Sequence, residues 1–183
     1  AGAHKLGIIH RDVKPQNCVR IEVDGNPDHI KLIDFGITKK AGGDTGLTKD
    51  GFILGTPEYM APEFGSGAKA SQSSDIYALG VTLYKLLTGH VPFKGKTGLE
   101  TLELHRDAAL VLPSARAPER EIPDEADQIV AIALAKQPTG RFSSVLAMKQ
   151  ALQSALGLQQ SGLLTQAGLL TQAGLLTQPA FPT

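Results

Sequence analysis

Two short motifs, separated by a hairpin-like segment, constrain this chain more than any other feature. The first is HRDVKPQN at residues 10–17, and the second is DFG at residues 34–36. Two runs between the motifs alternate in polarity, which is typical of short strands. They lie on either side of a cluster of turn-favouring residues at 24–28. The sequence therefore predicts a hairpin that Asn17 enters and Asp34 leaves, which would bring these two oxygen-bearing side chains close together.

Either motif alone is compatible with an ordinary turn, a charged one for HRD and one after a strand for DFG. In this order, with the internal Lys and Asn, they fit the H-R-D-x-x-x-x-N and D-F-G motifs of protein kinases. The chain therefore closely resembles eukaryotic-type serine/threonine protein kinases over residues 1–156. The resemblance implies transfer of the ATP γ-phosphate to Ser or Thr hydroxyls of a protein substrate, with Mg²⁺ as the metal ion.

The resemblance implies a role for each polar residue of these motifs. Asp12 would act on the proton of the substrate hydroxyl, and Lys14 would contact the transferred phosphate of ATP. Asn17 and Asp34 would hold Mg²⁺, which prefers oxygen ligands and completes its shell with phosphates and water. Thr56 would hydrogen-bond Asp12 and Lys14 and help to seat the substrate hydroxyl. Because a proline follows Thr56, this residue is also suited to a helix N-cap, and the two roles do not exclude each other.

Three further residues are expected to support the site rather than to catalyse. By resemblance, Glu63 forms a buried ion pair with Arg141, far along the chain. Asp75 matches an aspartate that accepts hydrogen bonds from backbone N–H groups of the catalytic loop. The alternative for Asp75 is an acidic residue that complements the dipole of the helix predicted at 73–89.

The segment between DFG and the motif APE at residues 61–63 resembles a kinase activation segment. Its middle is rich in glycine and polar residues, which predicts a mobile loop. Arg11 is the residue that, in many kinases, pairs with a phosphorylated side chain in this loop, where a phosphate adds about −1.5 to −2 charge. The sequence offers Thr48 and then Thr45 as phosphosite candidates. The alternative is a flexible loop that is never modified.

The expected fold is α+β and mainly α-helical, the larger C-terminal lobe of a protein kinase with one or two small β-hairpins. A helix at 73–89 is apolar on nearly every face and is predicted to be buried as the scaffold. Further helices are predicted at 97–109, 124–136 and 143–156, with a loop at 110–122.

The sequence contains no G-x-G-x-x-G loop, strand lysine or helix glutamate that would match the smaller kinase lobe. The N-terminal lobe is therefore expected to be absent from this chain, and the chain alone is expected to have little or no kinase activity. The alternative is a non-catalytic fragment that acts as an interaction or regulatory module.

The tail at residues 157–183 departs from the preceding domain. The hexapeptide [S/A]GLLTQ occurs three times between residues 161 and 178. A six-residue period does not keep one helical face. We interpret the tail as a low-complexity linker or a recent repeat expansion outside the kinase fold, with a partner-binding segment as the alternative.

Composition narrows the class of protein. The 183 residues are 42% hydrophobic and carry 18 basic and 18 acidic side chains, which is typical of one globular domain and argues against a nucleic-acid or membrane partner bound through bulk charge. The single cysteine, Cys18, excludes an intrachain disulfide and fits a reducing compartment. No apolar run approaches about 20 residues, so no transmembrane helix is expected. We expect a cytoplasmic protein or the cytoplasmic part of a larger membrane protein.

Four histidines without metal-like spacing are predicted to be solvated or in loops: His4, His29, His90 and His105.

Overall fold

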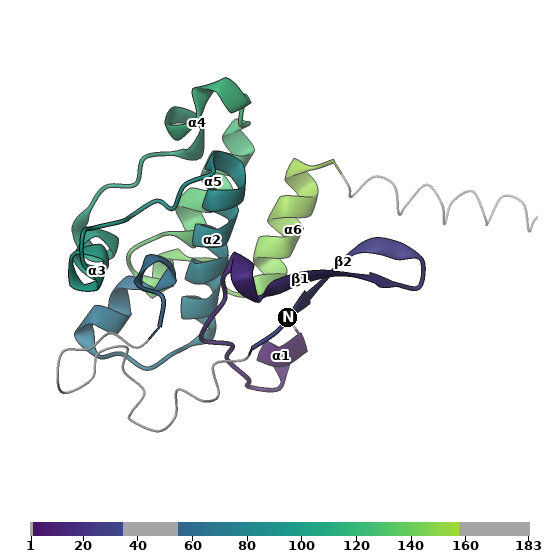
Figure 1. Cartoon of the computed structure of the whole chain (residues 1–183), viewed down its shortest axis with the longest axis horizontal. Helices are drawn as coiled ribbons and strands as arrows, with labels where there is room; N and C mark the ends of the chain where they lie inside the picture. Colours follow the sequence, from purple (N-terminus) through teal and green to yellow (C-terminus); the bar gives the residue numbers. More distant parts are fainter. Residues whose placement is uncertain (1, 35–54, 158–183) are drawn as a thin grey trace, which may run out of the picture.

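The long helix α2 (Gln72–Thr88) lies at the centre of the molecule, with shorter helices around it and a two-stranded hairpin projecting to one side (Figure 1). The structure is a computed structural model that describes residues 2–34 and 55–157. Within these ranges the predicted class, α+β and mainly helical with a small hairpin, is confirmed. No helix of the described ranges is long and apolar enough to cross a membrane.

Both ends of α2 are fixed by local sequence. At its start, the Ser71 hydroxyl accepts the Ser74 N–H at 3.2 Å, and the Ser74 hydroxyl accepts the Ser71 N–H at 2.9 Å. This reciprocal capping box satisfies backbone donors that the first helical turn leaves unpaired. At its end, Gly89 adopts φ 80°, which glycine adopts without a steric penalty. The helix therefore matches the predicted segment to within one residue at each end.

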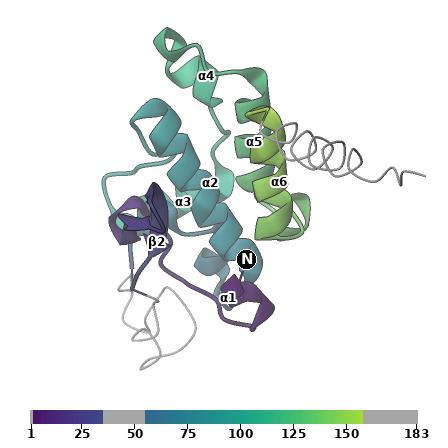
Figure 2. The same ribbon diagram turned by 90° about the vertical axis from the view of Figure 1, so that its right-hand side faces the viewer.

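The core forms on two sides of α2. Helix α5 (Asp124–Ala133) packs so closely that a Cβ atom at Gly80 would lie 2.7 Å from the Cβ of Ala133. Helix α6 (Val145–Ala155) lies beside α5, as Figure 2 shows. Aromatic and aliphatic side chains that are buried within these contacts include Ile76, Tyr77, Val81, Tyr84, Ile129, Val130, Leu134 and Met148.

The remaining helices are short. The segment at 110–122, predicted as a loop, contains helix α4 and the 3₁₀ turn η5, so that prediction was wrong. Each of these turns begins with a proline, whose fixed φ suits the first helical position. The other helical elements are α1 (Gly2–Lys5), η1 (Pro15–Asn17), η3 (Pro57–Tyr59), η4 (Pro62–Ser66), α3 (Gly98–Asp107), α4 (Pro113–Arg116), η5 (Pro118–Arg120) and η6 (Pro138–Gly140).

Strands β1 (Cys18–Val23) and β2 (Asn26–Leu32) form the predicted antiparallel hairpin. The turn is tighter than predicted, because strand β2 already begins at Asn26. Asp24 and Gly25 both have positive φ, 52° and 76°, as a two-residue type I′ turn requires. Most side chains of the hairpin are exposed, in keeping with its projection away from the helices (Figure 1).

His105 was predicted to be solvated or in a loop, and that prediction was wrong. It lies in α3 and is fully buried. Its Nδ1 atom is 2.7 Å from the Tyr77 hydroxyl, and its ring meets the Phe93 ring edge-on at 5.1 Å. Burial, followed by the nearby Lys136 ammonium group, lowers the pKa of His105 to about 4. The imidazole is therefore neutral at pH 7 and serves as a packing residue that joins α3 to α2.

Candidate active site

Asp75 fixes the catalytic loop to the central helix. Its carboxylate accepts the backbone N–H of His10 at 2.8 Å and that of Arg11 at 2.9 Å. Asp75 is almost fully buried in the first turn of α2, so its charge also complements the helix dipole. Arg11 has φ 69°, a conformation that is uncommon for residues other than glycine. The hydrogen bonds to Asp75 hold the loop in this conformation immediately before Asp12.

His4 also binds Asp75, which the sequence did not indicate. The His4 Nε2 atom lies 2.8 Å from the Asp75 carboxylate, and its side chain is 11% exposed. The His4 carbonyl also accepts a hydrogen bond from the Gln72 side chain at 3.0 Å. The prediction of a solvated His4 was therefore wrong. No local signal could have paired these residues, which come together only because α1 lies beside the start of α2.

The structure brings four of the predicted site residues into one cluster. The Lys14 ammonium group lies 3.0 Å from the Asp12 carboxylate and donates a hydrogen bond to the Thr56 hydroxyl at 3.0 Å. The Asn17 amide nitrogen donates to the Asp12 carbonyl at 2.7 Å and to its carboxylate at 3.1 Å. The Lys14 ammonium group and the Asn17 amide both contact the same carboxylate oxygen of Asp12, Oδ2, and together they orient the carboxylate.

The contacts of Thr56 bear on the two roles that the sequence left open for this residue, which do not exclude each other. It occupies the N-cap position of η3, but its side chain makes no capping hydrogen bond. The hydroxyl is instead the acceptor for Lys14. Proline at the next position suits the start of the turn, because its fixed φ is that of the first helical position and it has no N–H to leave unpaired. Of the two hydrogen bonds that the resemblance implies for Thr56, with Asp12 and with Lys14, the structure shows the one with Lys14.

His10 connects the two sequence motifs. Its Nδ1 atom accepts the Asp12 N–H at 3.3 Å, and its Nε2 atom lies 3.1 Å from the Ile33 carbonyl. A neutral imidazole with its proton on Nε2 satisfies both interactions. The Ile33 N–H also donates to the Asn17 carbonyl at 2.9 Å. The backbone directly before Asp34 is thus tied to the catalytic loop, as the predicted hairpin required.

Asn17 and Asp34 present oxygens of the kind that Mg²⁺ prefers. Because the Asn17 amide nitrogen faces Asp12, its carbonyl oxygen is left as the ligand atom. Asp34 is exposed, with φ 55° at the end of the hairpin. One carboxylate and one amide, completed by phosphates and water, fit the usual protein coordination of Mg²⁺. Within residues 2–34 and 55–157, no group of three or more His, Cys, Asp or Glu side chains is arranged to hold a metal ion.

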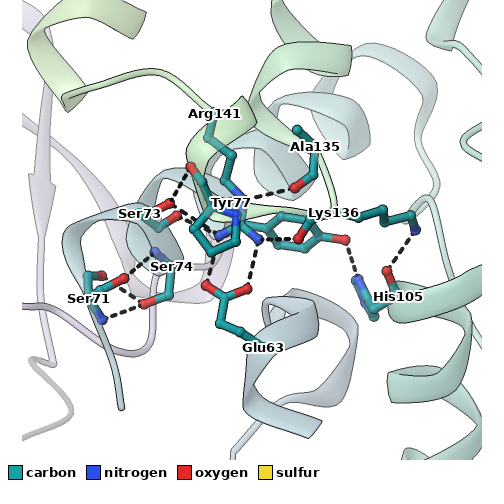
Figure 3. Close-up of polar contacts among 10 residues, drawn as sticks. Glu63, Ser71, Ser73, Ser74, Tyr77, His105, Ala135, Lys136 and Arg141 are labelled. Atoms are coloured by element: carbon teal, nitrogen blue, oxygen red, sulfur yellow. Dashed lines mark hydrogen bonds and ion pairs between the residues drawn. The ribbon is translucent and has the colours of Figure 1, made fainter. Parts of the chain in front are cut away.

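Glu63 and Arg141 form the expected ion pair, a bidentate one at 2.8 and 2.7 Å (Figure 3). The Arg141 side chain is completely buried and also donates to the carbonyls of Ser73 and Ala135. Its guanidinium group stacks over the Tyr77 ring at 4.7 Å. One side chain thus joins the segment after the activation loop to α2 and to the loop after α5. These contacts join separate segments of the fold, in keeping with the supporting role expected for this residue.

Several predicted features fall outside the described residues. They are the phosphosite candidates Thr45 and Thr48, residues 35 and 36 of the DFG motif, and the repeats of the tail. Helix α6 ends at Ala155, close to the boundary predicted at 156. The proposed roles of the loop threonines and of the tail remain predictions.

Comparison with known proteins agrees with this geometry. Residues 2–156 match the protein kinase domain family. The chain is 41% identical over 154 residues to the serine/threonine-protein kinase Pkn1 of Myxococcus xanthus, a match that covers 84% of the chain and 22% of Pkn1. It is 39% identical to PknL of Mycobacterium tuberculosis, covering 84% of the chain and 37% of PknL. PrkC of Bacillus subtilis is 37% identical, covering 85% of the chain and 23% of PrkC.

The chain thus spans well under half the length of these relatives, while the match covers nearly all of its described residues. The matched region includes the catalytic-loop cluster, its Asp75 anchor and the Glu63–Arg141 pair. The chain therefore belongs to the family of eukaryotic-type serine/threonine protein kinases.

Proposed function

We propose that the full-length protein transfers the γ-phosphate of ATP to serine and threonine hydroxyls of other proteins in a Mg²⁺-dependent reaction. The observation that carries this proposal is the cluster in which Lys14 lies 3.0 Å from both the Asp12 carboxylate and the Thr56 hydroxyl. Phosphoryl transfer depends mainly on positioning and on positive charge near the phosphates. A fixed carboxylate beside a cation meets both demands.

Asp12 would be the catalytic residue that receives the substrate hydroxyl. Its carboxylate accepts a hydrogen bond from the Asn17 amide, which limits rotation of the group. The substrate hydroxyl would donate to the carboxylate and pass its proton there as its oxygen bonds the γ-phosphorus and the bond from that phosphorus to the bridging oxygen of ADP breaks. Thr56 borders the same position and would help to align a small aliphatic hydroxyl.

Lys14 would supply positive charge where negative charge develops on the transferred group. Its ammonium group has three donors, of which one is directed to Thr56 and another faces Asp12. The Asn17 amide oxygen and the Asp34 carboxylate would hold Mg²⁺ beside the phosphates of ATP. When bound, the metal ion neutralises phosphate charge and orients the phosphates.

A phosphate on the activation segment would regulate this site. We propose Thr48, then Thr45, as the modified residue, with Arg11 as the side chain that contacts the phosphate. Arg11 supports this role because it lies immediately before Asp12 and its backbone is fixed by Asp75. Mass spectrometry of active full-length protein should detect the phosphate on one of these threonines, and unmodified loop peptides from fully active protein would contradict the proposal.

The reaction class is tested by incubating the full-length protein with γ-labelled ATP, Mg²⁺ and a mixed protein substrate. The label should appear on serine and threonine but not on tyrosine, and a chelator should abolish the transfer. Asp34→Asn should raise the Mg²⁺ concentration needed for half the maximal rate. Asp24→Asn is the matched control, because Asp24 lies in the hairpin turn, where asparagine also fits. No turnover at all would favour a non-catalytic interaction module, and nucleotide hydrolysis without phosphoprotein would contradict transfer to a protein substrate.

A further inference from the structure

An open groove of about 250 Å³ lies beside the catalytic cluster. One wall comes from Gln16 of the catalytic loop, from Thr56, which precedes the η3 turn, and from Tyr59 of that turn. The other wall is formed by the C-terminal end of α2 and the segment after it, residues 85–94. Thr56 belongs both to this groove and to the cluster around Asp12. A bound peptide could therefore occupy both at once.

The charged side chains of this groove are mainly basic, so we name it the basic groove. Its charged side chains are the two lysines Lys85 and Lys94 and a single carboxylate, Glu58; His90 also lines the groove. His90 and Lys94 are exposed, while Lys85 is half-buried on the last turn of α2. A concave surface with an excess of one charge attracts ligands of the opposite charge more strongly than a flat surface does.

Lys85 has a simpler explanation as a cation that complements the C-terminal end of the helix dipole. Other donors already serve that end, however. The Leu87 carbonyl accepts the Arg120 guanidinium at 2.8 Å, and the Tyr84 carbonyl accepts the Thr88 hydroxyl at 2.9 Å. The Lys85 ammonium group instead makes a long hydrogen bond of 3.4 Å to the Tyr59 hydroxyl, in the wall of the groove. Its remaining donors can therefore serve a ligand in the groove.

We propose that the basic groove binds an anionic side chain of the substrate, a carboxylate or a phosphate, close in sequence to the residue that is phosphorylated. This inference rests on the proposed kinase function and names the substrate class. An extended peptide advances about 3.3–3.6 Å per residue. With the acceptor hydroxyl at Asp12, a neighbour within about three positions can reach the groove. Lys85 and Lys94 are then specificity-determining residues.

The test uses the full-length protein and a set of peptides that differ at one position near the acceptor serine. Glutamate, glutamine, lysine and phosphoserine are placed in turn at each of three positions on either side. At one position, kcat/KM for the glutamate peptide should exceed that for the glutamine peptide about three- to tenfold, and the lysine peptide should be poorest. The preference should weaken at high salt. Comparison of glutamate with phosphoserine separates a carboxylate ligand from a phosphate ligand.

Charge reversal identifies the groove as the source of the preference. Lys85→Glu and Lys94→Glu should each lower the ratio of kcat/KM for glutamate over lysine peptides, and together they should invert it. Lys149→Glu is the matched control, because this exposed lysine lies on α6, outside the groove. Should Lys85→Glu fail to fold, the exposed Lys94 variant carries the test alone. An unchanged ratio in the folded variants overturns the proposal.

A binding measurement separates failure of this inference from failure of the proposed function. Fluorescent peptides with alanine in place of the acceptor serine are titrated against the same proteins. Tighter binding of the glutamate peptide, lost in Lys94→Glu, supports the basic groove even if no phosphotransfer is seen. If the protein transfers phosphate but prefers no anionic side chain, either in kcat/KM or in peptide binding, the kinase function stands and the proposed role of the basic groove is wrong.

Discussion

At Arg141, one buried guanidinium group satisfies backbone carbonyls from two segments and neutralises Glu63. The sequence could pair Glu63 with Arg141 only through family resemblance, since 78 residues separate them. The carbonyl partners at Ser73 and Ala135 were not predictable, because any backbone offers the same acceptor. The geometry explains why arginine is suited to this position: its fixed fork of donors serves a carboxylate and carbonyls together.

Removal of this side chain should destabilise the protein strongly. Arg141→Ala leaves the Glu63 carboxylate largely buried without its partner and should lower the free energy of unfolding by about 3–5 kcal/mol. Arg141→Lys should lie in between, because lysine cannot form the bidentate pair. Urea denaturation of the purified variants measures both effects. Arg20→Ala is the control, since its ion pair with Asp28 is exposed and should leave the midpoint unchanged. Equal midpoints for Arg141→Ala and the wild type would contradict this account.

Because His105 is buried, we expect the free energy of unfolding to decrease as the pH falls. Burial lowers its pKa in the folded protein to about 4, against 6.5 ordinarily. The unfolded chain therefore binds a proton between these values that the folded protein does not. Stability is fully present above about pH 6.5 and falls as the pH drops towards 4, by roughly 3 kcal/mol for this group.

Denaturation of the wild type and of His105→Gln at pH 7.5, 5.5 and 4.5 measures this contribution. Glutamine does not titrate, so the stability advantage of the wild type should shrink at each step towards acid. Other titrating groups are common to both proteins and cancel in the difference. A difference that stays constant with pH would show that His105 does not titrate in the predicted window.

At the scale of elements, the helices were predictable where a local signal sets their ends. Serines at the start of α2 and Gly89 at its end are such signals, and the helix forms between them. The five-residue turn predicted between β1 and β2 was wrong, since Asp24 and Gly25 alone make the turn. The cluster at 24–28 contains several turn-favouring residues, and composition alone does not choose between them.

The close packing of α2 on α5 can be tested by adding a methyl group at Gly80. Alanine has a better helix propensity than glycine by about 1 kcal/mol, so Gly80→Ala on an isolated helix would stabilise it. Here the new methyl group would meet Ala133 at 2.7 Å and Leu134 at 3.1 Å. Overpacking should outweigh the propensity gain and leave a net loss of about 1–2 kcal/mol.

Thermal or urea denaturation of Gly80→Ala checks this balance. Gly65→Ala is the matched control, because nothing lies within 4 Å of the added methyl group and the backbone there is not left-handed. It should leave stability nearly unchanged. A Gly80→Ala variant at least as stable as the wild type would mean that the two helices can separate slightly without cost.

At the scale of the whole molecule, the candidate site was predictable where its residues share one motif. The resemblance to one kinase motif drew attention to Asp12, Lys14 and Asn17, and the structure places these side chains in contact, although the contacts themselves were not predicted. His4, which meets Asp75 across the fold, was not predictable. The basic groove was also not predictable from the sequence, because Lys85 and Gln16 come from distant segments and line one groove only in the folded chain.

The central claim is that Asp12 acts on the substrate hydroxyl, and the kcat of Asp12→Asn in the full-length protein tests it most directly. Asparagine keeps the size of the side chain but cannot take a proton, so kcat should fall about 10²–10⁴-fold while the KM for ATP changes little. Asp28→Asn, an exposed change on the hairpin, should retain wild-type kcat. An Asp12→Asn variant that keeps kcat within a few fold of the wild type would contradict the assignment.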